Sequence, residues 1–213
     1  MGDILSDVET FEERLSLPKG FYDNLLKEDD WSFVIKLSAL FEAACTQTLV
    51  VKLGSPDIED CFTHLEQSNS KYGKILFLKK LGAIYPVQAK FLEKLAELRN
   101  QLAHNISNAA FEFKSHIEGM NENQKKIFIK WVGHGIHPKV EYKGTVITRE
   151  DFVVSHPKIS LWLTSAEVLA CMHLEIDHSE STQNLGISRW LTDKDMSRLP
   201  RYITLCTPGM GLN

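Results

Sequence analysis

The segment that most constrains the fold is residues 29–54, DDWSFVIKLSALFEAACTQTLVVKLG, which carries an apolar stripe at helical spacing. Apolar and small residues recur every three or four positions, so they lie on one face of a long helix that must be buried. The residues of this face are Phe33, Leu37, Leu40, Phe41, Ala44, Thr48 and Val51. Asp29 or Asp30 can cap the helix, and Gly54 can end it. A buried helix of this length indicates an all-α protein built as a helical bundle.

Shorter helical patterns occupy most of the remaining chain up to residue 176. They are expected at 55–67, 70–84, 86–105, 107–119, 121–133 and 156–176. The pattern changes after Gly133, where β-branched residues surround Lys143 and Gly144, and this arrangement predicts a short β-hairpin. The expected organisation is therefore an acidic lead-in, a helical bundle, and a C-terminal extension with the hairpin, one helix and an irregular tail from residue 177. The bounds of these three parts are 1–18, 19–135 and 136–213.

The composition fits a folded protein with a modest negative charge. Of 213 residues, 43% are hydrophobic and 24% are charged, and the net charge is −4. A surface that coats DNA needs an excess of Lys and Arg, so that class of protein is not expected, whereas a local RNA site is compatible with this charge. The sequence shows no apolar run of about 18 residues and no basic, apolar leader. We therefore predict no membrane span, no secretory signal and a cytoplasmic location.

The four cysteines are scattered, without the CxxC spacing that is typical of redox or zinc sites. Cys45 and Cys61 fall beside apolar residues in helical patterns, and Cys171 and Cys206 lie further along the chain. The sequence predicts small buried thiols in a reducing compartment.

The residues with the clearest chemical meaning lie in ELRNQLAHN, residues 97–105, at the end of a predicted helix. Cleavage of RNA without a metal needs a base that takes the proton of the ribose 2′-OH and a cation that holds charge on the phosphoryl oxygens. Histidine is suited to the first role because it titrates near neutral pH, which makes His104 the candidate. Arg99 suits the second role, because a planar guanidinium binds phosphate through two hydrogen bonds. The alternative is that both residues only decorate the negative end of a helix dipole.

The spacing of Arg99 and His104 raises a geometric question. At about 100° per residue, side chains five positions apart point about 140° apart on a straight helix, whereas Asn100 and His104 share a face. Two arrangements would bring Arg99 and His104 together. Either the helix bends or frays at residues 103–105, or a two-fold dimer places the motif of one copy beside that of its mate.

LRNQLAHN resembles the signature of the HEPN superfamily, an Arg, a polar residue and then a His after four intervening positions. The resemblance extends over residues 20–135 and implies a bundle of four or five main helices, dimerisation that joins the motifs and, in many members, metal-independent endoribonuclease activity. It implies that Arg99 binds the scissile phosphate, that His104 is a general base or acid, and that Asn100 positions one of them. Many such members are toxins or antiviral effectors, so we expect an RNA substrate, a homodimer and an antitoxin or regulatory protein partner.

Three stretches also resemble the mannitol-operon-repressor branch of this superfamily: DDWSFVIKLSALFEAA, KYGKILFLKKLGAI and FLEKLAELRNQLAH. That branch is regarded as regulatory, so the resemblance implies an alternative function as a non-catalytic transcriptional regulator or protein-binding module. The negative net charge suits a protein partner better than direct DNA binding. A helical scaffold without an active site is a third interpretation.

Charged residues outside the motif are further candidates. Glu42, beside Phe41 on the long helix, can orient Arg99 or His104 across the bundle, or it is a solvated carboxylate at the edge of the core. Four lysines around one predicted helix can follow an RNA backbone, although such a run is commonly a solvated face. These lysines are Lys71, Lys74, Lys79 and Lys80.

The remaining histidines make incomplete sets of metal ligands. His134 and His137 are three positions apart, but the second precedes a proline and no third ligand is evident nearby. Cys171, His173 and His178 are close together in the sequence but give similarly weak evidence for a metal site. We therefore predict no metal site and no cofactor.

Overall fold

The long helix α3, Asp30–Leu53, forms where the sequence predicts it. Asp29 caps this helix, because its carboxylate accepts a hydrogen bond from the backbone N–H of Ser32 at 2.8 Å. Gly54 ends the helix with a φ of 63°, a left-handed conformation that costs glycine little. Both ends of α3 are therefore set by the residues that the sequence indicates.

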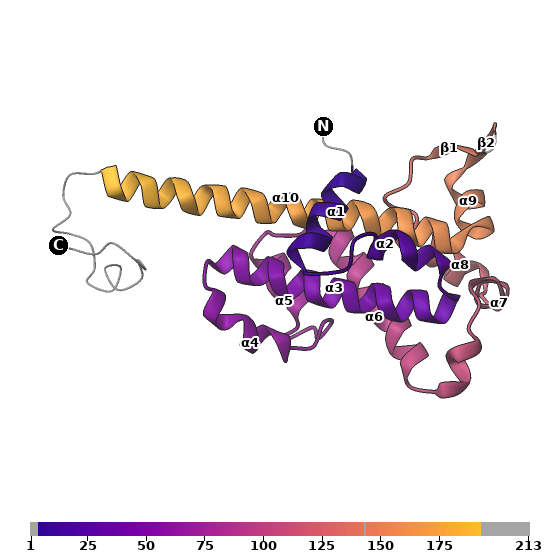
Figure 1. Cartoon of the computed structure of the whole chain (residues 1–213). Coiled ribbons are helices and arrows are strands. Elements are labelled where there is room, and N and C mark those ends of the chain that lie inside the picture. Colours follow the sequence, from indigo (N-terminus) through magenta and orange to yellow (C-terminus); the bar gives the residue numbers. More distant parts are fainter. Residues whose placement is uncertain (1–3, 143, 193–213) are drawn as a thin grey trace.

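The computed structural model describes residues 4–142 and 144–192. Within them, the α-helices besides α3 are α1 (Ile4–Arg14), α2 (Phe21–Asn24), α4 (Glu59–Thr63), α5 (Lys74–Lys80), α6 (Pro86–Ala103), α7 (Phe113–Glu118), α8 (Glu122–Val132), α9 (Arg149–Ser155) and α10 (Pro157–Thr192), as labelled in Figure 1. Short 3-10 helices are η1 (Leu25–Lys27), η2 (Pro56–Ile58) and η3 (Ile106–Ala110), and the strands are β1 (Lys139–Tyr142) and β2 (Thr145–Thr148). The all-α bundle with a short hairpin is confirmed.

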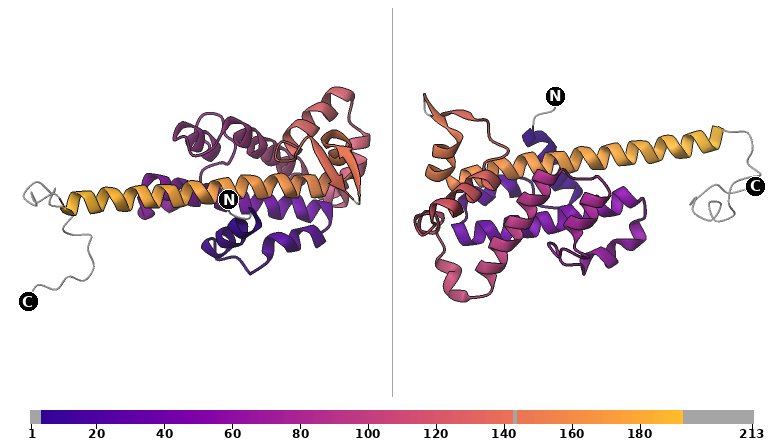
Figure 2. Two further views of the ribbon diagram at one scale, coloured as in Figure 1. Left: turned by 90° about the horizontal axis from the view of Figure 1, so that it is seen from above. Right: turned by 180° about the vertical axis from the view of Figure 1, so that it is seen from behind.

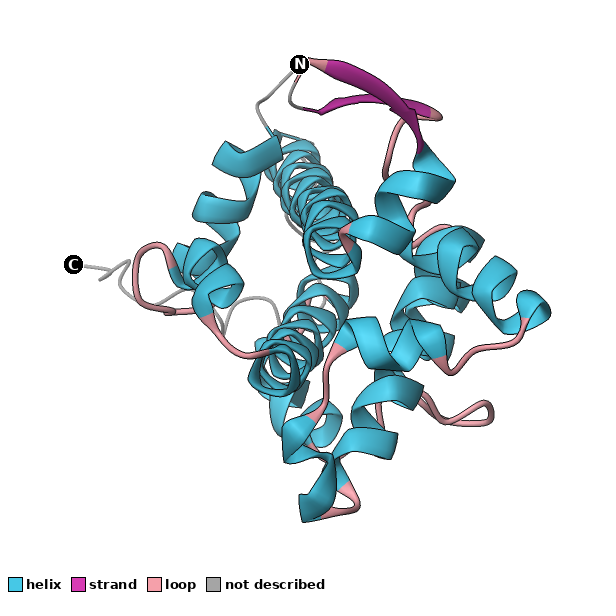
Figure 3. Cartoon of the chain, turned by 90° about the vertical axis from the view of Figure 1, so that its right-hand side faces the viewer, coloured by secondary structure: helices cyan, strands magenta, loops and turns pink. Residues whose placement is uncertain are grey.

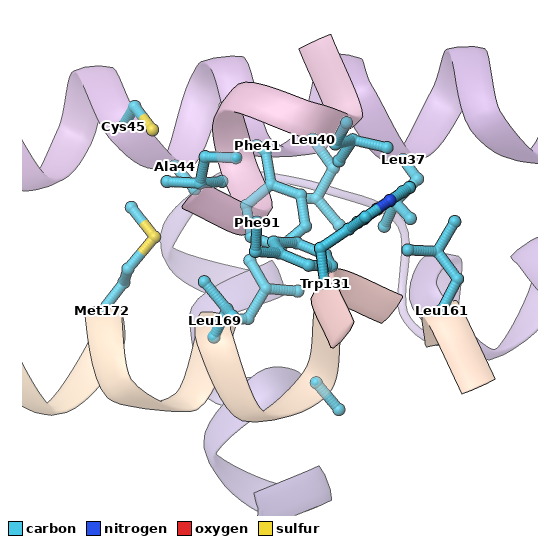
Figure 4. Packing of buried hydrophobic residues seen from close by; sticks show 14 of the residues in the cluster. Leu37, Leu40, Phe41, Ala44, Cys45, Phe91, Trp131, Leu161, Leu169 and Met172 are labelled. Atoms are coloured by element: carbon cyan, nitrogen blue, oxygen red, sulfur yellow. The ribbon is translucent and has the colours of Figure 1, made fainter. Parts of the chain in front are cut away.

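The two long helices, α3 and α10, pack against each other through the middle of the molecule. Figure 3 looks along the bundle, with these helices seen end-on and the shorter helices around them. Their facing sides form the core drawn in Figure 4, where Phe41 and Ala44 of α3 lie opposite Leu169 and Met172 of α10. None of these four side chains is more than 1% exposed. Burial of this apolar surface is the main source of stability in the bundle.

Phe91 of α6 fills the space between α3 and α8 (Figure 4). Its ring centroid lies 5.5 Å from that of Phe41 and 5.9 Å from that of Trp131. These contacts fix which face of α6 is buried. The polar residues Asn100 and His104 consequently remain exposed to solvent.

The hairpin predicted around Lys143 and Gly144 is formed by β1 and β2, which pair in antiparallel register with Lys139 opposite Thr148. This register leaves residues 143 and 144 as the connection. Gly144 has a φ of 76°, the positive value that tight hairpin turns require. The hairpin then leads into α9 at the end of the molecule where α10 begins (Figures 1 and 2).

The segment predicted as a lead-in, residues 1–18, contains a packed helix, so that prediction was wrong. Val8 and Phe11 of α1 are buried in the main hydrophobic cluster. Arg14 also binds α10, since its guanidinium donates hydrogen bonds to Glu180 at 2.5 and 3.1 Å. The contact between α1 and α10 orders a segment that looks polar and acidic in the sequence.

The irregular tail expected from residue 177 is also wrong as far as the described residues extend. Helix α10 continues to Thr192 and projects beyond the rest of the bundle (Figures 1 and 2). Part of its polar stretch is held by the end of α3, because Gln183 Nε2 donates a hydrogen bond to the carbonyl of Val51 at 2.8 Å. Residues 193–213 of the predicted tail lie outside the described part. The hydrophobic cluster contains residues from both sides of residue 135, so the predicted bundle and extension share one core.

Three predicted helices are shorter than expected. The segment 55–67 forms η2 and α4, the segment 70–84 forms α5, and the segment 107–119 forms η3 and α7. Polar side chains compete with the helix for backbone groups in such segments. Asn69 is one example, because its side-chain oxygen accepts hydrogen bonds from the N–H groups of Lys71 and Tyr72.

Two of the described helices are long and apolar enough to cross a membrane by length and composition alone, α3 and residues Pro157–Leu185 of α10. In each helix, 61% of the apolar window is buried inside the folded chain. The core helices of a bundle have the same property, so these segments are weak evidence for a membrane protein. The absence of a membrane span and the cytoplasmic location stay predictions.

Candidate functional site

The Arg-Asn-His motif lies where α6 ends. His104 is the C-cap of α6, with nearly helical φ and ψ values of −74° and −17°. Asn105 then caps η3, since its side chain accepts a hydrogen bond from the N–H of Ser107 at 3.1 Å. Asn108 donates a hydrogen bond to the carbonyl of Gln101 at 2.7 Å, which satisfies one of the free carbonyls of the last turn. The helix is therefore regular up to His104, and its end is closed by asparagine side chains.

Arg99, Asn100 and His104 line one pocket of about 370 Å³. Arg99 turns toward its neighbour, because its Nη1 donates a hydrogen bond to Asn100 Oδ1 at 3.0 Å. The long arginine side chain thus compensates for the angle between positions 99 and 104. Neither a bent helix nor a second copy is needed for both residues to reach this pocket. Its other lining residues are Ser38, Glu42, Glu66, Gln67, Ser68 and Ala96.

The two chemically active side chains of the motif are accessible from solvent. His104 is exposed, and within the described residues its ring makes no hydrogen bond or ion pair. The side chain of Arg99 is 41% exposed. A ligand can therefore reach both the imidazole and the guanidinium, which is the first requirement for proton transfer and phosphate binding.

Glu42 of α3 lies between two cations at this pocket. Its Oε2 is 3.7 Å from Arg99 Nη2, and its Oε1 is 3.7 Å from Lys74 Nζ. Lys74 is 1% exposed, so its charge depends on the carboxylate for compensation. The partly exposed pair with Arg99 adds little stability, but it holds the guanidinium at the pocket. The carboxylate that we expected to orient Arg99 or His104 thus lies beside Arg99.

The four lysines predicted to follow an RNA backbone do not share one surface. Lys74 is buried, and its inclusion was wrong because a buried ammonium cannot contact a backbone outside the protein. Lys71, Lys79 and Lys80 are exposed. Lys79 Nζ lies 3.9 Å from a carboxylate oxygen of Glu93, so this carboxylate competes with an anion for the ammonium group.

One wall of the pocket consists of Glu66, Gln67 and Ser68 in the loop between α4 and α5, which no motif in the sequence predicts. Gln67 Nε2 donates hydrogen bonds to the carbonyl of Phe41 at 3.4 Å and to Cys45 Sγ at 3.2 Å. Its Oε1 is buried without a hydrogen-bond partner among the described residues. No local pattern marks this wall, because only the tertiary fold brings the loop against α6.

The cysteines in the described part of the chain differ in their environments. Cys45 is buried as predicted, and burial raises the pKa of its thiol to about 12. Cys61 is exposed, so the prediction of a buried thiol was wrong there. The reason is that the short helix α4 buries only Phe62. Burial raises the pKa of Cys171 to about 11, and Cys206 lies outside the described residues.

His134 and His137 have separate partners. His134 Nδ1 lies 3.1 Å from the carbonyl oxygen of Trp131, and its Nε2 lies 3.2 Å from a carboxylate oxygen of Glu167. His137 Nδ1 lies 3.1 Å from the carbonyl oxygen of Lys139. Burial acts to raise the pKa of Glu167, but His134 together with hydrogen bonds from Cys171 and Gln88 outweighs it, and the pKa lies below its ordinary value. Within residues 4–142 and 144–192, no group of three His, Cys, Asp or Glu residues could hold a metal ion.

A larger hollow of about 520 Å³ lies between α6, α7 and α8. It is lined by His116, and burial lowers the pKa of this histidine. Its Lys94 is paired with Glu97, and no arginine is among its lining residues. The pocket at Arg99 is therefore better suited to a phosphate than this larger hollow.

No family model, curated protein or solved structure matches the chain. Membership of the HEPN superfamily consequently stays a prediction from the motif and its flanking helices.

The Glu42–Lys74 pair can be tested by its contribution to stability. We expect Glu42→Ala to lower the free energy of unfolding by about 1–3 kcal/mol, because a buried ammonium loses its carboxylate. Lys74→Met alone should have a small effect, since an apolar side chain replaces the buried charge. On the Lys74→Met background, most of the cost of Glu42→Ala should disappear. Denaturant unfolding of the four proteins measures this coupling, and equal costs on both backgrounds would exclude it.

Proposed function

We propose that the chain is a HEPN-type, metal-independent endoribonuclease whose active site is the pocket at the end of α6. The observation that carries this proposal is that Arg99, Asn100 and His104 line one solvent-accessible pocket, with Glu42 held beside the arginine. A base, a phosphate-binding cation and a polar positioning group are the components that RNA cleavage through the 2′-OH requires.

In the proposed reaction, His104 takes the proton of the ribose 2′-OH. The 2′-oxygen then forms a bond to the adjacent phosphorus, and the bond from phosphorus to the 5′-oxygen of the next nucleotide breaks. Arg99 stabilises the charge on the phosphoryl oxygens, and Glu42 limits the positions that the guanidinium can adopt. The protonated His104, directly or through a water molecule, returns the proton to the leaving 5′-oxygen. The products are a 2′,3′-cyclic phosphate and a 5′-hydroxyl.

We also propose that the active form is a homodimer, whose two copies contact each other through the exposed end of α6. Asn100, Gln101 and His104 are all exposed there, so a second copy has access to this surface. The exposed Lys71, Lys79 and Lys80 are proposed to contact the RNA backbone. A toxin or antiviral effector with this activity would need an antitoxin or regulatory protein as its partner.

A second function, a non-catalytic regulator or protein-binding module, is favoured by the charges in the same pocket. Two carboxylates, Glu42 and Glu66, line it together with the single arginine Arg99. This balance weakens the attraction of the pocket for a phosphate. In a regulator, the same polar groups would bind a protein partner.

The two functions differ in a cleavage experiment with matched oligonucleotides. Purified protein with EDTA is mixed with a labelled RNA oligomer or with its DNA counterpart. We expect cutting of the RNA alone, with cyclic phosphate at the new 3′ ends, because the 2′-OH is the nucleophile. Cutting of both oligomers contradicts the mechanism, and intact RNA with a well-folded protein favours the regulator.

A further inference from the structure

The pocket that Arg99 and His104 line has one wall formed by the loop between α4 and α5. Glu66, Gln67 and Ser68 provide this wall. The volume of the whole pocket, about 370 Å³, falls in the range of about 300–1,000 Å³ that is usual for small-ligand pockets. Arg99 and His104 can bind the phosphate of a nucleotide in this pocket, and the polar wall can bind its base.

The backbone of Glu66 and Gln67 in this loop is held by two hydrogen bonds to the first turn of α5. The N–H of Lys74 donates to the carbonyl of Glu66 at 3.0 Å, and the N–H of Ile75 donates to the carbonyl of Gln67 at 3.1 Å. The Gln67 side chain also binds α3 through its Nε2 group. The wall is therefore positioned before any ligand arrives, which lowers the entropy cost of binding.

The turn that follows the wall is equally constrained. The N–H of Gly73 donates to the carbonyl of Asn69 at 2.8 Å. A Cβ atom at position 73 would lie 2.5 Å from the backbone nitrogen and oxygen of Asn69, so only glycine fits. Asn69 Nδ2 in turn donates a hydrogen bond to Glu66 Oε2 at 3.0 Å. The tight turn thus holds the Glu66 carboxylate in place.

The free side-chain atoms of this wall are mainly acceptors. Glu66 uses one carboxylate oxygen for Asn69 and retains further acceptor capacity on both oxygens. Gln67 Oε1 also lacks a hydrogen-bond partner among the described residues, but this atom is buried and a ligand does not reach it. Glu66 is exposed, so its carboxylate is the acceptor of this wall that a ligand with N–H donors can contact.

Among the RNA bases, guanine has the matching edge. Its N1–H and N2–H groups are adjacent donors, which a carboxylate can accept with both oxygens. The Watson–Crick edges of adenine, cytosine and uracil each place a lone pair beside their donor, and a carboxylate repels that lone pair. Single-stranded RNA is commonly recognised through these edges. Glu66 belongs to a hydrogen-bonded loop, offers an accessible carboxylate, and lines the same pocket as Arg99 and His104. We infer that Glu66 selects guanine as the base of the nucleotide whose 3′-phosphate lies at Arg99 and His104.

The cleavage experiment for base selection rests on the proposed ribonuclease function. A second experiment, which measures nucleotide binding, tests base selection even when no RNA is cut. The cut sites in a random-sequence RNA pool are mapped for the wild type, for Glu66→Gln and for the control Glu118→Gln, an exposed glutamate on α7. We expect the wild type and Glu118→Gln to cut after guanosine. Glu66→Gln should lower the preference for guanosine over adenosine by about tenfold or more, because it loses a bidentate contact.

In parallel, guanosine 3′-monophosphate and adenosine 3′-monophosphate are titrated into the same three proteins. Binding that prefers the guanosine nucleotide and loses this preference in Glu66→Gln supports the inference, even if no RNA is cut and the proposed ribonuclease function fails. Cutting without base preference, or a guanosine preference that Glu66→Gln leaves intact, overturns the inference while the ribonuclease stands. Equal binding of both nucleotides by a protein that does not cut overturns both.

Discussion

His104→Ala is expected to lower the rate of RNA cleavage by about 100- to 10,000-fold, the range that general acid–base groups contribute. The expectation follows from the position of the imidazole, which lines the same pocket as Arg99 and has no partner of its own among the described residues. Because His104 is exposed at the end of α6, its removal should change the free energy of unfolding by no more than about 0.5 kcal/mol. The measurement compares initial cleavage rates and denaturant unfolding curves of the two proteins.

A matched control for this variant is His64→Ala. His64 is also an exposed histidine at the C-cap of a helix, α4, but it does not line the pocket. We expect it to cut RNA at the wild-type rate. If His104→Ala also cuts at that rate while remaining folded, the imidazole has no catalytic role. The regulator or scaffold interpretation would then replace the enzyme.

Phe91→Ala is expected to have the largest effect on stability, a loss of about 3–5 kcal/mol in the free energy of unfolding. The ring is fully buried and packs between Phe41 and Trp131, with His134 at 5.6 Å between ring centroids. Removing it leaves a cavity where α3, α6 and α8 meet, and rigid neighbours fill such a cavity only in part. Equilibrium unfolding in denaturant gives the change directly.

Val87→Ala provides the comparison on the same helix. Its side chain is 49% exposed, so its truncation should cost less than about 1 kcal/mol. A similar small loss for Phe91→Ala would mean that α6 is not anchored through this ring. Because α6 carries Arg99 and His104, that result would also remove the structural basis for their positions at the pocket.

Local sequence patterns were sufficient for the elements whose ends and faces depend on nearby residues. Asp29 and Gly54 delimit α3, and the residues around Gly144 form the hairpin, because caps and tight turns are made by residues close in the sequence. The motif on α6 was also visible, since its residues are five positions apart. The period of α3 predicted six of its buried residues, but Val51 of the predicted face is only partly buried. The period did not predict that residues off this face, such as Val34 and Leu49, are also buried.

The remaining features of the fold depend on contacts between residues that are far apart in the sequence. Helix α1 and the second half of α10 look polar in the sequence, yet Val8 and Phe11 of α1 are buried in the core. Arg14 also contacts Glu180, and Gln183 binds the end of α3. Lys74 looked like a surface lysine, yet the approach of α5 to α3 buries it beside Glu42. Its pairing could not be predicted because the two residues are far apart in the sequence.

The long helix, the hairpin, and an arginine and a histidine near the end of one helix were all predictable from local sequence. Tertiary packing places these two residues in one pocket, sets Glu42 beside Arg99, and adds Glu66, Gln67 and Ser68 as a further wall. The difference arises because helix caps and periodic stripes depend on neighbours within a few residues. A pocket depends instead on how three separate segments pack, and their side-chain contacts leave no periodic signal in any one of them.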